Sequence, residues 1–70
     1  MGAATTLALL NYLMTREQLI AEADLLAERL VAIGDMDSFE QIFGSRDPNL
    51  DLKTFPTERL QDIYDENIKD

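Results

Sequence analysis

The sequence predicts an all-α protein, a small bundle of three to four helices in a single domain that spans residues 1–70. Three observations indicate this class. No segment alternates polar and β-branched residues in the way that marks a strand. Apolar residues between positions 16 and 34 recur at the spacing of a helix. Gly34 and Gly44 each follow an amphipathic stretch, and glycine commonly ends a helix in the left-handed conformation.

The first element in chain order is the uncharged, leucine-rich stretch of residues 6–13, which could form a short helix. No glycine or proline separates it from the next element, so the two could also be continuous. The capping residue Thr15 favours a bend between them. We therefore interpret residues 1–14 either as part of the folded unit or as an N-terminal extension, flexible or interface-forming.

The second element is the clearest helix, which we predict to run from a cap at Thr15 to Gly34. Thr15 and Gln18 fit a capping box, in which each side chain accepts a hydrogen bond from the backbone of the other residue. Met14 is placed to pack on Leu19 as a hydrophobic staple. No Gly or Pro interrupts the segment before Gly34, which is suited to the C-cap.

This central helix carries an apolar seam whose members are spaced by alternating steps of four and three residues. The seam, a dimer or core surface, comprises Leu19, Ala23, Leu26, Leu30 and Ile33. A core this small typically supplies only about 3–5 kcal/mol, and the absence of Cys and His removes disulfides and zinc sites as further support. We therefore expect a homodimer packed along this helix. A self-sufficient monomer and docking of the helix in a groove of another protein remain alternatives.

A third, short helix is predicted between Gly34 and Gly44, with Ser38 as its N-cap and Gln41 completing a second capping box. Residues 45–53 are polar and contain a proline, so they are expected to form an ordered loop. Two alternating leucines in this loop are placed to attach it to the core, Leu50 and Leu52.

The last helix is predicted to begin near Pro56 or Thr57, because proline is favoured in the first turn. Its inward positions are Leu60, Ile63 and Tyr64. Its acidic residues recur at i, i+4 and i+7 on another face, and we select four residues of this helix as partner-binding candidates: Glu58, Asp62, Tyr64 and Asp65.

The charge distribution restricts the class of partner. Fourteen acids against six bases give a net charge of −8. Direct binding to nucleic acid or to an anionic membrane needs a basic face, so neither is expected. The N-terminus lacks the basic region of a signal peptide, and its apolar stretch is too short to cross a bilayer. We therefore expect a cytoplasmic protein.

Catalysis and metal binding receive little support from the sequence. Without His or Cys, a nucleophile would have only a carboxylate or a lysine as its base, so we expect no enzyme and no cofactor. Four residues occupy ligand positions of an EF-hand-like loop and are weak calcium candidates: Asp47, Asn49, Asp51 and Glu58. Leu52 stands where that loop needs glycine for its sharp turn.

These observations favour a small acidic regulator that blocks or sequesters a larger protein by direct contact, with a basic surface as one possible feature of that partner. One alternative is an acidic mimic of nucleic acid that inhibits a basic nucleic-acid-binding protein. A further alternative is a degenerate, single EF-hand-like calcium-binding module. None of the motifs is specific enough to indicate a family.

Overall fold

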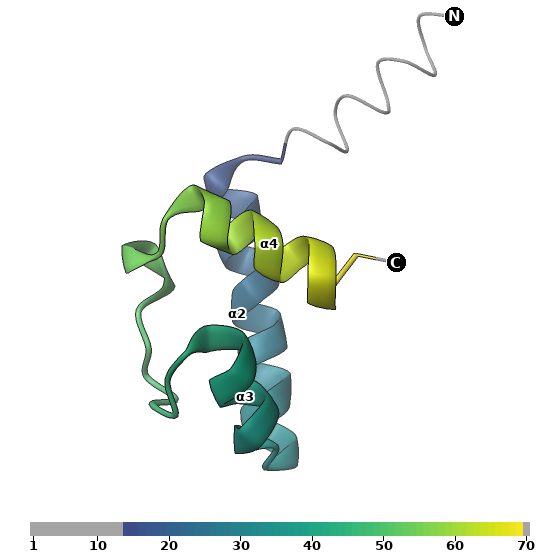
Figure 1. The fold of residues 1–70 in the computed structure, drawn as a ribbon, viewed down its shortest axis with the longest axis vertical. Coiled ribbons are helices and arrows are strands. Elements are labelled where there is room, and N and C mark those ends of the chain that lie inside the picture. The colour runs from purple at the N-terminus through teal and green to yellow at the C-terminus, as the bar shows by residue number, and fades with distance from the viewer. Residues whose placement is uncertain (1–13, 70) are drawn as a thin grey trace, which may run out of the picture.

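The structure is a computed structural model that describes residues 14–69 of the 70-residue chain. The elements in this part are α2 (Arg16–Ile33), α3 (Met36–Phe43), a 3₁₀ turn η1 (Leu52–Thr54) and α4 (Thr57–Asn67) (Figure 1). No strand occurs between residues 14 and 69, so the predicted helical class is confirmed for this part of the chain. The expectations for residues 1–13, a short helix or an extension, lie outside the described residues.

Both predicted ends of α2 are confirmed. The Thr15 hydroxyl accepts a hydrogen bond from the Gln18 backbone N–H at 3.1 Å, and the Gln18 side chain accepts one from the Thr15 N–H at 3.0 Å. At the other end Gly34 adopts φ +76°, a left-handed conformation that costs glycine no Cβ clash. The Asp35 N–H then donates to the Leu30 carbonyl at 2.9 Å, which completes a Schellman motif.

The predicted N-cap of the third helix is wrong. Asp35, not Ser38, caps α3, because the Asp35 carboxylate accepts a hydrogen bond from the Ser38 N–H at 3.2 Å. Ser38 therefore lies within the first turn of the helix. Asp is as good an N-cap as Ser, so residue preference alone does not distinguish Asp35 from Ser38. The Schellman motif decides between them by placing Asp35 directly after α2, and the chain passes from one helix to the next without a linker.

This cap predicts an acid-sensitive contribution to stability. The hydroxyl of Ser38, and after it the Ser38 backbone N–H, stabilise the ionised carboxylate and lower the pKa of Asp35 from its ordinary value of 3.8. Because the pKa is lowered on folding, the contribution is complete above the ordinary value and is lost as the pH falls through the lowered one. An Asp35→Asn variant keeps a capping acceptor but has no proton to bind.

We therefore expect the Tm of the wild type to fall more steeply below roughly pH 4 than the Tm of the Asp35→Asn variant. Thermal unfolding followed by circular dichroism at a series of acidic pH values measures the difference. A Glu22→Gln variant, which removes a carboxyl from α2 without touching the cap, controls for net charge. Equal acid sensitivity of the wild type and the Asp35→Asn variant would contradict the prediction.

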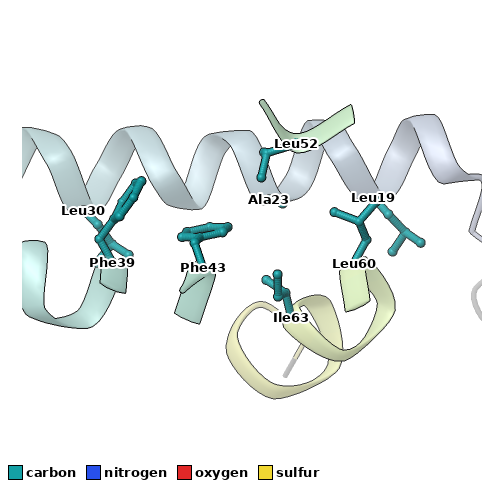
Figure 2. Close-up of a cluster of buried hydrophobic side chains, with 8 residues drawn as sticks. All are labelled: Leu19, Ala23, Leu30, Phe39, Phe43, Leu52, Leu60 and Ile63. Atoms are coloured by element: carbon teal, nitrogen blue, oxygen red, sulfur yellow. The ribbon is translucent and has the colours of Figure 1, made fainter. Parts of the chain in front are cut away.

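Helix α2 is the element on which the others assemble. It contacts α4, α3 and η1, and in Figure 1 α4 crosses the half of α2 near its beginning while α3 lies beside the other half. The buried core draws on all four elements and consists of Leu19, Ala23, Leu30, Phe39, Phe43, Leu52, Leu60 and Ile63. In Figure 2 the labelled side chains of α3 and α4 point toward α2, and Leu52 reaches it from η1.

The chain between α3 and α4 is attached as predicted. Leu52 is buried in the core, and Leu50 packs against it while remaining partly exposed. The last helix begins at Thr57 after Pro56, in agreement with the predicted start. Its inward residues Leu60 and Ile63 are buried.

Two arginines also hold the elements together. The Arg16 guanidinium donates to the Thr57 hydroxyl at 3.0 Å and to the Lys53 carbonyl at 2.7 Å, which joins the beginnings of α2 and α4. The Arg59 guanidinium donates to the Ile42 carbonyl at 3.1 Å, where the end of α3 has carbonyls without helical partners. It also lies 5.5 Å from the centre of the Phe55 ring, within the range of a cation–π contact.

Candidate protein-binding surfaces

The five seam residues of α2 have different environments. Leu19, Ala23 and Leu30 are buried within the chain, and Leu26 is partly buried against the same core. Ile33 is 69% exposed. Heptad positions on an α-helix drift by about 20° per heptad, which contributes to this difference, and Ile33 is also the last residue of α2. Leu19, Leu26 and Ile33 are seven residues apart, and they move from fully buried to exposed in that order.

The acidic face predicted for the last helix exists. Glu58, Asp62, Asp65 and the neighbouring Glu66 are all exposed residues of α4. Tyr64, the fourth partner-binding candidate, is only partly exposed and packs against the core. The helix therefore brings the carboxylates together on its outer side and directs Tyr64 toward the protein interior. We call Glu58, Asp62, Asp65 and Glu66 the α4 acidic face.

No ion pair among the described residues involves an acid of the α4 acidic face. All ion pairs between residues 14 and 69 involve Arg46, which contacts Asp37 at 3.0 Å and Glu40 at 3.1 Å. The hydrogen bonds that the Arg46 guanidinium donates, first to Asp37 and then to Glu40, raise its pKa. The α4 acidic face has no such partner, and the last turn of α4 contains no basic residue.

The positions of these acids are unfavourable for the helix that carries them. Glu58, Asp62 and Glu66 form two successive i, i+4 pairs of like charge, each of which destabilises a helix by about 0.2–0.5 kcal/mol. Asp65 and Glu66 also lie near the C-terminal end of α4, where the helix dipole disfavours negative charge. Glu58, in the first turn, is placed favourably, and Asp65 accepts a hydrogen bond from the Gln61 side chain at 3.0 Å. The α4 acidic face thus reduces the stability of the helix that presents it.

Two of the four calcium candidates, Asp47 and Asp51, accept local hydrogen bonds, and calcium binding stays a prediction. Asp47 accepts a hydrogen bond from the Asn49 N–H at 2.9 Å, and Asp51 caps η1 by accepting from the Lys53 N–H at 3.0 Å. Glu58 lies in the first turn of α4. In the part of the chain that the structure describes, no three acidic side chains come together in a group that could hold a metal ion. The loop geometry is that of successive Asx turns.

A groove between α2 and the loop before α4 was not predicted from the sequence. Its walls include Ala27 and Val31 from α2 and Leu50 and Leu52 from the loop, and its volume is about 360 Å³. A second hollow continues it toward the start of α2 and shares Asp24 as well as the two leucines. Two features of the sequence could have indicated the groove. Apolar residues alternate with acids on one side of α2, and the loop carries the alternating leucines Leu50 and Leu52.

Comparison with known proteins does not assign a class to this chain. No family model, no curated protein and no solved structure matches it. Among residues 14–69, no helix is both long enough and apolar enough to cross a membrane. The two surfaces, the α4 acidic face and the groove beside α2, are therefore the basis for inferring a function.

Proposed function

We propose that this chain is a binding protein rather than an enzyme, and that it regulates a larger protein by docking on it and blocking or sequestering it. The contact is made by the α4 acidic face with a basic surface of the partner. The observation that carries the proposal is the arrangement of Asp62, Asp65 and Glu66, which have no ion-pair partner within residues 14–69. Asp62 and Glu66 form a like-charge i, i+4 pair, and Asp65 and Glu66 lie near the C-terminal end of α4. A basic partner would relieve that repulsion.

A nucleic-acid mimic is the second form of this proposal. The α4 acidic face presents several exposed carboxylates in a row along one helix, which suits a protein whose own site binds phosphates. Complexes of this kind lose affinity as salt rises, since exposed charges separated by more than about 10 Å are screened at 0.1 M salt. A partner held mainly by apolar contacts would be much less sensitive to salt.

The experiment that tests the proposed function is affinity capture with the full chain immobilised. Nuclease-treated lysate is applied, and the column is washed first at low and then at high salt. The Asp62→Lys variant is compared with the wild type and with a Glu22→Lys variant, which makes the same charge change on α2. A partner lost by the first variant and retained by the second supports the proposal. A partner that both variants retain equally excludes the α4 acidic face as the contact.

The Asp62→Lys change should also stabilise the isolated protein. It makes the pairs with Glu58, Asp65 and Glu66 attractive instead of repulsive, and it makes the i, i+3 pair with Arg59 repulsive instead of attractive. The net gain that we expect in the free energy of unfolding is about 0.5–1 kcal/mol. The Tm should rise by a few degrees in a chain of this size. Urea unfolding at low salt measures the gain, and added salt should reduce it. A lower stability would contradict the proposed repulsion.

Association into a homodimer is part of the same proposal. Leu19, Ala23 and Leu30 are covered within the chain, so the interface must use apolar residues that remain exposed. Leu25 is 57% and Ile33 is 69% exposed, and the two are eight residues apart on one side of α2. Light scattering over a range of protein concentrations tests this association, with Leu25→Asp as the disrupting variant.

A further inference from the structure

The groove beside α2 is lined by apolar side chains that the fold does not cover. Val31 is 40% exposed on one wall, and Leu50 is partly exposed on the other. Phe39, which is only 1% exposed, contributes to the floor, so the groove leads directly to the core. Figure 1 shows the chain between α3 and α4 running along one side of α2, where it forms the second wall.

The rim of the groove is acidic. Together, the groove and its continuation are lined by four acids and one base: Glu17, Asp24, Glu28, Asp51 and Lys53. Glu17, Asp24 and Glu28 follow one edge of α2 and are exposed. None of the four acids has an ion-pair partner within the described residues. An apolar floor beneath a row of carboxylates is complementary to a ligand with apolar side chains flanked by positive charge.

The length of the groove indicates the form of that ligand. From Glu17 to Ala32 the lining residues extend along α2 for about 22 Å at the helical rise of 1.5 Å per residue. A partner helix of about fifteen residues covers this distance. Its apolar side chains at helical spacing would enter the groove between α2 and the loop, which is the usual way in which a groove binds an amphipathic helix.

We propose that this groove binds a basic amphipathic helix of a partner protein, with its Leu-like side chains against Val31, Leu50 and Leu52 and its Lys or Arg residues against Asp24 and Glu28. The inference does not rest on the α4 acidic face, which is a different surface. The groove provides the apolar contact and determines the register of the bound helix along α2. The acidic rim excludes acidic helices and favours basic ones.

The test uses the full chain, labelled with ¹⁵N, and a synthetic helical peptide of about fifteen residues built from Leu, Lys and Ala at amphipathic spacing. A peptide of the same composition with scrambled order is the first control. Two variants complete the design. Val31→Arg places a positive charge in the groove, and Glu22→Gln makes the same change in net charge at a residue of α2 that does not line the groove.

We expect the amphipathic peptide to shift the amide signals of Ala27, Val31 and Leu50, and the scrambled peptide to leave them unchanged. Val31→Arg should weaken binding by about tenfold or more, and Glu22→Gln should leave it within about twofold of the wild type. Both variants change the net charge by the same amount, so the contrast separates binding in the groove from general electrostatic attraction. Circular dichroism of both variants confirms that they are folded.

Several results would overturn the proposal. Peptide shifts confined to α4 would place the binding site on the other surface. Concentration-dependent shifts of the groove amides without peptide would identify a second copy of the chain as the occupant. A Leu9→Ser/Leu10→Ser variant that binds the peptide when the wild type does not would identify residues 1–13 as the occupant. Equal loss of affinity in Val31→Arg and Glu22→Gln would show that the peptide is attracted by net charge alone.

Discussion

Replacing Phe39 by alanine is expected to unfold the protein at room temperature. Phe39 is 1% exposed, and its ring lies 5.0 Å from that of Phe43, centre to centre. Truncating a buried Phe to Ala typically costs about 3–5 kcal/mol, because the cavity that remains is only partly filled by its neighbours. A chain of this size has a total stability of only about 3–5 kcal/mol from its core. The expected cost is therefore close to the whole free energy of unfolding of the protein.

Far-UV circular dichroism and urea unfolding measure this loss. Phe39→Leu is the control, since it keeps most of the apolar volume and should leave a folded protein of lower stability. The two variants share the α3 backbone and its Asp35 cap, so a difference between them reports packing. If Phe39→Ala unfolds cooperatively with the same urea midpoint as the wild type, α3 is not part of the core.

Replacing Leu19 by alanine is expected to cost about 2–5 kcal/mol, whereas Ile33→Ala should cost close to nothing in the monomer. Both residues belong to the predicted seam of α2, but Leu19 is 1% exposed and Ile33 is 69% exposed. The comparison thus holds helix, seam and type of substitution nearly constant and varies only burial. Urea unfolding of both variants, at one low protein concentration, gives the two free energies.

The same pair reports on the proposed dimer. If a second copy covers Ile33, the cost of Ile33→Ala should grow with protein concentration, because dimerisation stabilises the folded state by mass action. The cost of Leu19→Ala should change little, since that residue is buried within one chain. Equal and concentration-independent costs for the two variants would contradict both the packing of α2 against the core and an interface at Ile33.

The seam of α2 shows where prediction from the sequence ends. A heptad spacing identified the buried residues Leu19, Ala23 and Leu30 correctly as members of the apolar face. It could not place Ile33, because the spacing describes a face and not what covers it. The drift of a straight helix turns the last heptad position away from the core. A partner wound around α2 would have kept Ile33 in contact, so the outcome depends on tertiary arrangement.

The cap of α3 and the groove show two further limits. Asp35 and Ser38 are comparable N-caps, and the choice between them depends on where the preceding helix finishes its Schellman motif. The groove depends on how far the loop of residues 45–51 stands from α2, which no local pattern records. Its residues were recognisable individually, as loop leucines and as apolar and acidic residues of a helix, but not as two walls of one site.

The sequence by itself determined the helices, most of their ends and the residues on the α4 acidic face, because these follow from capping, glycine conformation and side-chain spacing within about four residues. The tertiary structure alone decided which apolar residues α3, α4 and η1 cover on α2, and which they leave open. Burial depends on residues distant in the chain, such as Phe39 and Leu60 against α2. For that reason the groove and the exposure of Ile33 emerge only once the elements are packed.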